Sequence, residues 1–350
     1  MAAERNVELG FVEETEKFLL KSRFFPSKVG GVPAWLSLNP LPSAEELTCR
    51  VCSKPTVFLL QVYAPDSSTS FAFHRTVFIF ICRNDNCCKA NCADNLIVLR
   101  SQLPKVNDFF RSQPPAEVPI ENEIDASKYA KLCRVCGGVG PKTCGKCGCV
   151  SYCSKEHQAV DWKAYHKREC STNKTDLKAE KSYAVLFPEF EIVTETEIYT
   201  PKKDAGQTSE EEKMRQYKEF LESNKGSDFS TSFPEKELQS MASQETVDDK
   251  QIRKFKERIS AEPDQILRYD KGGEPLWISQ STCPVSIPDC SCGAPRQFEF
   301  QVLPHLLSHL QVDKLGTSLD WGTLCVYTCS NSCDVGNQYV KEYIFKQDVV

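Results

Sequence analysis

The sequence has little histidine, with five residues in a chain of 350, and it contains no familiar catalytic signature. We find no GxSxG, HExxH, protein kinase or dinucleotide-binding pattern. His74 lies beside a predicted strand. His305 and His309 form an i, i+4 pair that could face a metal, but without a third ligand such a pair is more typical of a helix surface. We therefore expect a protein that is not an enzyme.

Long hydrophobic runs are also missing. No apolar stretch approaches the roughly 18 residues that a membrane-spanning helix needs, so we expect no membrane partner. The first residues carry no basic flank followed by an apolar run, which argues against a secretory signal and for a soluble, intracellular protein. A basic excess is absent too, because the formal net charge is −5. Electrostatics therefore give the whole chain no general affinity for nucleic acid.

Cysteine, by contrast, is abundant, with 19 residues. In the reducing compartment that we expect, this number favours metal binding over disulfide bonds. Four close pairs of thiol or imidazole groups occur within 38 residues: Cys133 and Cys136, Cys144 and Cys147, Cys153 and His157, and His166 and Cys170. Eight such groups are enough for two four-coordinate zinc ions. A disulfide framework and unrelated cysteines are the alternatives, but disulfides need an oxidising compartment, and eight ligands in four close pairs argue against a chance arrangement. So short a segment cannot bury enough apolar surface to fold alone, and zinc would supply the missing stability.

This segment, which ends in YCSKEHQAVDWKAYHKREC, resembles the MYND zinc-finger family. The resemblance implies two interleaved zinc sites, one held by Cys133, Cys136, Cys153 and His157 and the other by Cys144, Cys147, His166 and Cys170. The family usually has cysteine in place of His157, but a neutral imidazole is also an acceptable zinc ligand. Cys149 is left over, as a buried or free thiol.

MYND fingers resemble docking modules that accept short proline-containing peptides against a shallow groove. In this chain, Gln158 and Trp162 lie on the helical part that would border such a groove. Packing between the two zinc turns is the alternative role for Trp162.

Residues 30–92 and 272–334 repeat the same features in the same order. Each begins with a Gly-Gly-x-Pro-x-Trp element, followed by a cysteine pair, an apolar strand (57–65 or 298–305), another β-rich run and a second cysteine pair. The cysteines are Cys49, Cys52, Cys82 and Cys87 in the first repeat and Cys290, Cys292, Cys329 and Cys333 in the second. Two pairs separated by a hairpin-like segment are typical of a zinc knuckle, so we predict a third and a fourth structural zinc.

Simple burial of these cysteines is the alternative. The step from Cys290 to Cys292 is one residue shorter than the favoured spacing, and Cys88 and Cys92 compete with Cys87 for one place. The Gly-Gly-x-Pro-x-Trp element could also be a phosphate loop, but it lacks the Gly-Lys-Ser/Thr ending and precedes no helix signal. We predict instead a tight turn that pins its tryptophan, Trp35 or Trp277, into the core.

The segments between these units are rich in proline or in charge. Residues 111–128 are polar and rich in proline, which is typical of a flexible connector. Residues 186–193 are predicted to form a strand that rejoins the β body. Residues 189–249 carry 16 acidic against 7 basic residues, a charge of −9, and are predicted to be largely disordered, with one helix candidate at 209–223. Residues 250–259 are predicted to form a helix that leads into the second repeat.

These observations predict an α+β fold that is mainly β. The two similar zinc-knuckle halves should pack as one body, because each alone offers few strands and a small core. The finger and the acidic linker are then insertions between them. The expected division is an amino-terminal half at 1–110, a linker at 111–130, the finger at 131–172, a connecting strand with the acidic linker at 173–250, and a carboxyl-terminal half at 251–350.

Over nearly its whole length the chain resembles the programmed cell death protein 2 family. The motifs that carry this resemblance are LGFVE (9–13), FPSKVGGVPAWL (25–36), FLLQVYAP (58–65), LCRVCGGVGPKTC (132–144), LFPEFEIV (186–193), EPDQILRY (262–269), DCSCGAPR (289–296) and DWGTLCVYTC (320–329). The resemblance implies a nuclear and cytoplasmic escort for a newly made small-subunit ribosomal protein, which supports ribosome biogenesis and is linked to cell proliferation and cell death. The acidic stretch is compatible with shielding a basic client.

The alternative is a nuclear transcription regulator that acts through DNA or co-repressors, with the finger as the contact. Residues 131–170 carry eight basic and three acidic residues, a local charge of +5, but the finger lacks the Cys2His2 layout of zinc modules that read DNA. In either case we expect zinc as the cofactor, proteins as the main partners and no small-molecule substrate.

Overall fold

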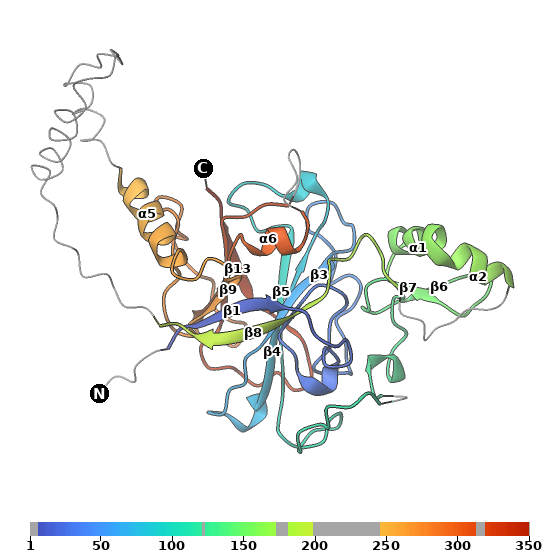
Figure 1. Cartoon of the computed structure of the whole chain (residues 1–350). Helices are drawn as coiled ribbons and strands as arrows, with labels where there is room; N and C mark the ends of the chain where they lie inside the picture. The colour runs from blue at the N-terminus through green and yellow to red at the C-terminus, as the bar shows by residue number, and fades with distance from the viewer. Residues whose placement is uncertain (1–5, 121–122, 173–180, 199–245, 313–318, 350) are drawn as a thin grey trace, which may run out of the picture.

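Eleven strands form one antiparallel sheet, and this sheet curls into a nearly closed barrel (Figure 1). The structure, a computed structural model, describes residues 6–120, 123–172, 181–198, 246–312 and 319–349. The strands of the sheet are β1 (Glu8–Glu13), β2 (Lys28–Val29), β3 (Val57–Tyr63), β4 (His74–Ile81), β5 (Leu96–Leu103), β8 (Phe190–Thr196), β9 (Leu267–Tyr269), β10 (Arg296–Val302), β11 (Thr323–Cys329), β12 (Val340–Lys341) and β13 (Tyr343–Gln347). Their order is β12-β5-β4-β3-β2-β8-β1-β9-β10-β11-β13. The fold is mainly β, as predicted.

The last two strands close the barrel. β12 and β13 lie at opposite ends of the strand order, yet only Glu342 separates them in the sequence. β12 pairs with β5 and β13 pairs with β11, so one short segment is bonded to both edges of the sheet. The backbone N–H of Glu342 continues this seam by donating to the carbonyl of Val98 at 3.0 Å. Backbone groups that would otherwise line two open edges are thereby paired.

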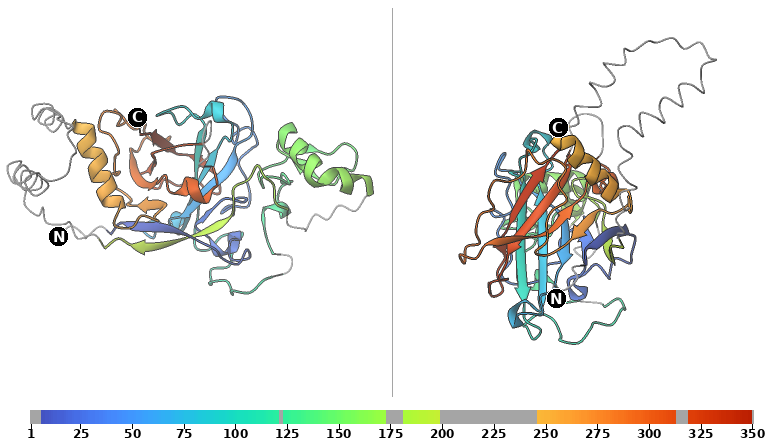
Figure 2. Two further views of the ribbon diagram at one scale, coloured as in Figure 1. Left: turned by 45° about the horizontal axis from the view of Figure 1, so that its top comes forward. Right: turned by 90° about the vertical axis from the view of Figure 1, so that its left-hand side faces the viewer.

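Helical segments are few and lie outside the sheet. The finger contains α1 (Lys155–Asp161), a π-helical turn η5 (Trp162–His166) and α2 (Lys167–Thr172) in one run, beside a small sheet of β6 (Lys142–Thr143) and β7 (Ser151–Tyr152). Among the described residues the other helices are α5 (Val247–Ile259) and α6 (Leu306–His309), and the 3-10 turns are η1 (Ser22–Phe24), η2 (Ser70–Ala72), η3 (Asp85–Cys87) and η4 (Ala126–Lys128). The finger and α5 stand on opposite sides of the barrel (Figures 1 and 2). No helix in the described ranges is long and apolar enough to span a bilayer.

Strand β4 shows why the apolar runs of this sequence form a barrel wall. All eight of its residues are buried. Val77 and Ile79 belong to the main core of the barrel. Phe78 and Phe80 point to the opposite face, where they pack against Trp35 of the first Gly-Gly-x-Pro-x-Trp element. Because both faces of this strand are covered, apolar residues follow one another in its sequence instead of alternating with polar ones. The prediction that Trp35 is pinned into the core is confirmed.

The two repeats share local geometry as well as sequence features. In the first, the side-chain amide of Gln61 bonds both backbone groups of Ala34, at 2.9 and 3.2 Å. In the second, Gln301 bonds both backbone groups of Leu276 in the same way, at 2.6 and 3.2 Å. β3 and β10 also carry a β-bulge at matching positions. Both Gly-Gly-x-Pro-x-Trp elements are therefore turns clamped by a strand glutamine, although Trp277 in the second is only half-buried.

The connecting elements agree in part with the sequence. Residues 250–259 are helical, and α5 begins three residues earlier because Thr246 and Asp249 form a capping box. The strand predicted at 186–193 is β8, which begins and ends later and rejoins the barrel by pairing with β1 and β2. The helix predicted at 209–223 and most of the acidic stretch lie outside the described residues.

A buried ion pair joins the two halves inside the barrel. The side chains of Arg75 on β4 and Glu299 on β10 have no exposed area. Two guanidinium N–H groups donate to the two carboxylate oxygens, one of them at 2.7 Å, and the Thr328 hydroxyl donates to the same carboxylate. Although burial opposes it, the Arg75 guanidinium holds the pKa of Glu299 below its usual value. Each charge thus depends on its partner for compensation.

Replacing Glu299 should therefore destabilise the barrel strongly. In Glu299→Ala the Arg75 charge is left buried without a partner, and we expect the free energy of unfolding to fall by about 3–5 kcal/mol. Chemical denaturation followed by circular dichroism measures this loss. The matched control is Glu257→Ala on the exposed surface of α5, which should stay within about 0.5 kcal/mol of the wild type. A loss at Glu299 no larger than at Glu257 would contradict the assignment.

Candidate metal centres

The first cluster of the finger gathers Cys133, Cys136, Cys153 and His157. Their ligand atoms all lie within 4.8 Å of one another. The sulfurs of Cys136 and Cys153 are 3.7 Å apart, and His157 Nδ1 lies 3.6 Å from the Cys133 sulfur and 3.1 Å from the Cys153 sulfur. Ser154 begins α1 as its N-cap and accepts from the His157 N–H at 3.1 Å, which fixes the first turn that carries the imidazole.

The second cluster of the finger gathers Cys144, Cys147, His166 and Cys170, also within 4.8 Å. The Cys147 sulfur lies 3.5 Å from His166 Nε2. His166 ends the π-helical turn η5 and Cys170 follows in α2, and both side chains are buried. Along the sequence, the first and third ligand pairs belong to the first cluster, and the second and fourth pairs belong to the second cluster. The two clusters are interleaved, and they contain the same two sets that the resemblance to MYND fingers implies.

Each Cys-x2-Cys pair of the finger sits in the same backbone turn. The N–H groups of Gly137 and Gly148 donate to the carbonyls of Cys133 and Cys144, both at 2.9 Å. Both glycines have positive φ angles, 70° and 68°. Residues with a Cβ rarely adopt this conformation, so glycine at these positions lets the paired sulfurs converge.

Asp161 is a buried acid that the sequence reasoning did not single out. It accepts the hydroxyl of Tyr152 at 2.6 Å and that of Tyr183, which lies beyond the finger, at 2.8 Å. Arg134 lies 3.5 Å from the same carboxylate and 2.6 Å from Glu169. This network ties the helical run to the first turn of the finger. The available signal was an acid in the middle of a helix whose neighbours are ligands and aromatic residues.

The first flanking cluster consists of Cys49, Cys52, Cys82 and Cys87. The sulfurs of Cys52 and Cys82 are 3.6 Å apart. The Ser53 N–H donates to the Cys49 carbonyl at 3.0 Å and closes the first turn with a φ of 55°. Cys82 directly follows β4 and Cys87 ends the 3-10 turn η3, so the second pair is presented by the end of a buried strand.

The second flanking cluster consists of Cys290, Cys292, Cys329 and Cys333. The Cys290 and Cys333 sulfurs are 3.8 Å apart, and those of Cys292 and Cys329 are 3.6 Å apart. The short step between Cys290 and Cys292 is accommodated by Gly293, which has a φ of 84° and donates to the Cys290 carbonyl at 2.8 Å. Cys329 is the last residue of β11, which corresponds to the place of Cys82 after β4.

The donor sets fit zinc in type and in spacing. With zinc–sulfur bonds of about 2.3 Å, two sulfurs of a tetrahedral site lie about 3.8 Å apart. Four sulfur–sulfur pairs, one in the first finger cluster, one in the first flanking cluster and two in the second flanking cluster, lie 3.6 to 3.8 Å apart. All 19 cysteines are free thiols, and a disulfide would instead require about 2.05 Å. Four Cys/His clusters consistent with zinc sites are therefore present, two in the finger and one in each flanking half.

One thiol in each cluster has a lowered pKa. At Cys52 and Cys144 burial opposes the shift, but hydrogen bonds from the backbone at Lys54 and Cys147 lower the pKa to about 7 and about 6 respectively. At Cys292 a backbone hydrogen bond at Ala294 lowers the pKa to about 7. Hydrogen bonds with the neighbouring cluster thiols hold the pKa of Cys133 well below its usual range. Since the thiolate is the metal-binding form, these hydrogen bonds favour the metal-binding state of one ligand in each cluster.

Three cysteines that lie close to cluster ligands in the sequence do not belong to a cluster. Cys88 and Cys92, which compete with Cys87 in the sequence, lie outside the cluster. The Cys88 thiol donates to the carbonyl of Asp320 at 3.4 Å. Cys149 is exposed rather than buried, and its thiol donates to the backbone carbonyl of Cys147 at 3.1 Å.

The other side chains singled out in the sequence are half-buried or paired. Gln158 and Trp162 are both half-buried on the helical run of the finger, so each has an accessible part. The Trp162 ring meets His166 edge to face at 5.8 Å between centroids, which gives it a packing role as well. His74 is buried between aromatic rings, and burial lowers its pKa to about 4.

His305 is the N-cap residue of the short helix α6 and His309 is its last residue, with ring centroids 5.1 Å apart. Nε2 of His305 lies 3.8 Å from the carboxylate of Asp264. Within the described residues, neither histidine belongs to a group of three or more metal-ligating side chains.

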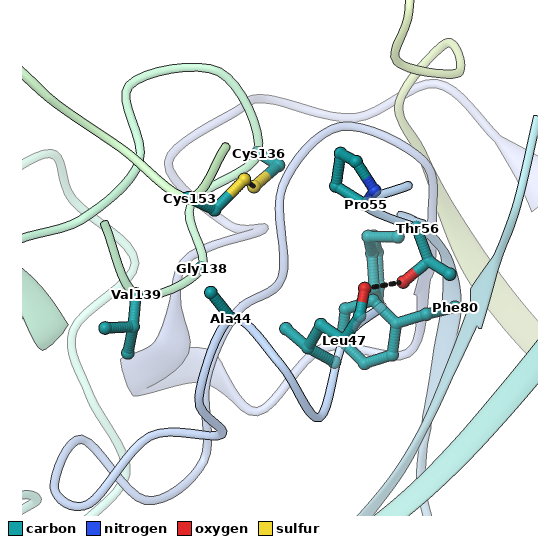
Figure 3. Close-up of a pocket in the computed structure, with 10 residues that line it drawn as sticks. Ala44, Leu47, Pro55, Thr56, Phe80, Cys136, Gly138, Val139 and Cys153 are labelled. Atoms are coloured by element: carbon teal, nitrogen blue, oxygen red, sulfur yellow. Dashed lines mark hydrogen bonds between the residues drawn. The ribbon is translucent and has the colours of Figure 1, made fainter. Parts of the chain in front are cut away.

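The finger is attached to the barrel by its first cysteine turn. The Trp35 indole N–H donates to the carbonyl of Gly137 at 2.9 Å. A Cβ on Gly137 would lie 3.0 Å from Val32, so the two turns are in close contact. Figure 3 shows Cys136 and Cys153 pointing toward one another beside the loop that precedes the first flanking cluster. The pocket at this junction has a volume of only about 10 Å³, room for about one water molecule.

A second attachment follows the finger. The Arg83 guanidinium donates to three successive carbonyls, at 3.2, 3.0 and 3.3 Å, from residues 184–186. Its cationic carbon also lies 4.7 Å from the ring centroid of Phe187, which is part of the barrel core. Both ends of the finger are therefore held against the amino-terminal half.

Three family descriptions match this chain. They are "Programmed cell death protein 2, N-terminal domain" at residues 6–117, "MYND finger" at 133–170 and "Programmed cell death protein 2, C-terminal putative domain" at 249–348. None of them indicates a catalytic family. No solved structure matches the chain.

The chain is also similar to curated proteins over most of its length. It is 47% identical to "Programmed cell death protein 2" of Rattus norvegicus, over 98% of this chain and 96% of that protein. It is 28% identical to "Programmed cell death protein 2-like" of Homo sapiens, over 88% and 85%. It is 26% identical to "Probable 20S rRNA accumulation protein 4" of Schizosaccharomyces pombe, over 87% of each.

The four clusters predict the metal content of the protein. Elemental analysis of the purified full chain should give four zinc ions per chain, one for each cluster. Cys87→Ser should lower this number by one, because three ligands remain in that cluster. The matched controls Cys88→Ser and Cys92→Ser change neighbouring thiols outside the cluster and should retain four ions. A wild-type value of two would confine the metal to the finger.

Proposed function

The chain belongs to the programmed cell death protein 2 family, and on that premise we propose that it is a non-catalytic, zinc-dependent protein-binding factor. In this proposal it escorts a newly made small-subunit ribosomal protein and so supports ribosome biogenesis. Through ribosome supply it is linked to cell proliferation and cell death. It works in both nucleus and cytoplasm, because such a client is made in one compartment and assembled in the other. The sixteen clustered side chains bind four structural zinc ions.

The link to ribosome biogenesis rests on a distant relative. The name of the Schizosaccharomyces pombe protein concerns the accumulation of 20S rRNA, and that protein matches this chain over 87% of its length. The match extends through both halves and the finger rather than through the finger alone. A shared role would therefore involve the barrel as well as the zinc finger.

The geometry of the finger favours protein binding as the activity. Its attachment to the barrel through Trp35 and Arg83 fixes its orientation, so partner-facing residues are held in place before a partner arrives. Gln158 and Trp162 lie half-buried on the helical run, where an extended peptide can contact them. Preorganisation of this kind lowers the entropy cost of binding. The observation that carries the proposal is this rigidly held MYND finger within a full-length family match.

A small-molecule substrate is not favoured. The pocket between the finger and the barrel holds about one water molecule and is lined by apolar side chains and cluster thiols. Ligand sites usually enclose about 300–1,000 Å³. The surface of the finger and of the barrel is thus the better candidate for recognition.

One observation favours the second candidate, a nuclear transcription regulator that acts through DNA or a co-repressor. Seven basic side chains on the finger are exposed: Lys131, Lys142, Lys146, Lys155, Lys163, Lys167 and Arg168. Such a surface attracts nucleic acid or an acidic peptide by general electrostatics. A peptide-binding groove on the same finger would also suit a proline-containing co-repressor segment.

Affinity purification from cells should separate these functions. We expect a small-subunit ribosomal protein to be enriched with the wild-type full chain and equally with Cys149→Ser, which changes an exposed thiol outside the clusters. Cys153→Ser removes one ligand from the finger and tests which surface holds the client. Loss of the ribosomal protein would assign the contact to the finger, and retention would assign it to the barrel. Its absence from the wild-type eluate would contradict the escort function.

The second candidate has its own test. If the finger binds DNA, the affinity of the full chain for duplex DNA should fall steeply with salt, and Lys163→Ala with Lys167→Ala should reduce the slope by about one to two. Fluorescence anisotropy at several salt concentrations measures this slope. Binding that is absent at low salt rules out the direct DNA contact.

A further inference from the structure

The last strand of the first half reaches into the metal-binding loop of the second half. This loop, residues 329–334, is named the second metal loop. Arg100 on β5 donates to the Cys333 sulfur at 3.3 Å and to the Cys333 carbonyl at 3.3 Å. Gln102, two residues along the strand, donates to the carbonyls of Ser332 and Cys333 at 3.2 and 3.3 Å. The guanidinium has no exposed area, so this contact is shielded from water.

The last strand of the second half does the same to the first half. Residues 82–92, which follow β4 and carry Cys82 and Cys87, are named the first metal loop. Lys346 on β13 donates to the Lys89 carbonyl at 3.0 Å, and its Nζ lies 3.7 Å from the sulfur of Cys88, next to a cluster ligand. Asp348 accepts the Asn91 N–H at 2.6 Å. The Asn91 side chain accepts the Asp348 N–H at 2.9 Å in return.

The two contacts correspond residue for residue. Arg100 and Lys346 are 246 positions apart in the sequence, and so are Gln102 and Asp348. In each half the last strand thus supplies a buried cation, followed two residues later by a polar side chain, to the loop of the opposite half. The correspondence makes the contacts a feature of the repeat rather than an accident of one loop.

The chemistry of a metal site explains why a cation is useful there. Four thiolates around a divalent zinc ion leave a net charge of about −2, and part of the second flanking cluster is buried. A guanidinium N–H on a thiolate sulfur offsets part of this charge and orients the ligand. In the first flanking cluster the Asn84 backbone N–H donates to the Cys82 sulfur instead, at 3.5 Å.

Arg100 also connects the metal loop to the barrel seam. Its Nε donates to the Glu342 carboxylate at 2.6 Å, and Arg296 of the second half donates to the other oxygen of that carboxylate at 2.7 Å. The Cys329 N–H donates to Glu342 as well, at 3.3 Å. Glu342 is the residue between β12 and β13, where the sheet closes. A metal ligand, the seam and both halves therefore share one buried network.

We propose that the two flanking metal loops are reciprocal latches of the barrel: zinc shapes each loop, and a buried cation from the last strand of the opposite half grips the shaped loop. Loss of zinc from either loop releases the opposite last strand and opens the seam. Arg100 and Lys346 are positioning residues in this device, since each acts on a metal loop without being a ligand. The inference depends on zinc binding by the flanking clusters and not on the identity of the client.

Hydrogen exchange on the full chain tests the coupling. Cys292→Ser removes an exposed ligand of the second flanking cluster, a residue for which we find no contact with Arg100. We expect one zinc ion fewer and a loss of amide protection in β5, which belongs to the opposite half. Cys52→Ser should act reciprocally on β13. The matched control Cys147→Ser empties a finger site and should leave β5 and β13 protected.

A second experiment separates the latch from general destabilisation. Arg100→Gln should speed the release of one zinc ion to a chromogenic chelator by about tenfold or more, as loss of an outer-shell partner does. The control is Arg75→Gln. Arg75 is an equally buried arginine that pairs with a glutamate of the opposite half, and it bonds Ala64, Glu299 and Thr328 but neither metal loop. Its loss destabilises the barrel but removes no contact with a metal loop, so zinc release should accelerate much less than in Arg100→Gln. Equal release from Arg100→Gln and Arg75→Gln overturns the latch.

If a cysteine variant does not fold, the wild type gives the same answer. Zinc is withdrawn from the wild-type full chain with a chelator while exchange and zinc content are followed together. Loss of β5 protection in step with zinc from the flanking clusters supports the latch. Persistent β5 and β13 protection after all four ions have left overturns it. A starting content of two zinc ions also overturns it, but leaves the escort function to the purification experiment.

Discussion

The closure of the barrel depends on one short segment. Residues 340–347 pair with β5 on one side and with β11 on the other, so a sheet of eleven strands has no long open edge. The pairing with β5 covers only two residues, too few for a stable seam on backbone bonds alone. Glu342 strengthens this point by taking a guanidinium from each half. The two halves are therefore parts of one sheet rather than two bodies in contact.

The metal loops lie where this closure needs them. Cys82 directly follows the buried strand β4 and Cys329 ends the buried strand β11, so zinc at either cluster would fix a loop at the end of a barrel strand. Each loop is then in reach of the last strand of the other half. A barrel assembled from distant parts of the chain has a large loop-closure entropy cost, and zinc in the two flanking clusters would offset it at the two places where the halves meet. Two small metal sites, when filled, would thus stabilise one large fold.

The metal clusters and the turns could be predicted from the sequence, because ligand spacing and turn-forming residues are local features. The Cys-x2-Cys pairs, the Gly-Gly-x-Pro-x-Trp turns and the apolar run of β4 all carry their structural meaning within a few residues. The closed barrel could not be read, because strand order depends on contacts such as Arg75 with Glu299, which are 224 positions apart. Arg100 was missed for the same reason, since its partners Cys333 and Glu342 are 233 and 242 positions away. A charged residue in an apolar run signals a buried partner, but the partner lies elsewhere in the chain.

The repeat also explains where the inserted elements attach. In the first half, the turn at Trp35 holds the finger through the carbonyl of Gly137. In the second half, the corresponding turn holds α5, because Gln251 donates to the carbonyl of Trp277 at 3.0 Å and Phe255 packs in a cluster with Leu276 and Ile278 of the turn segment. Equivalent turns on a duplicated barrel lie on opposite sides, and Figure 2 shows the finger and α5 in those places. The duplication therefore supplies two docking points, and the difference between the halves lies in what each turn holds.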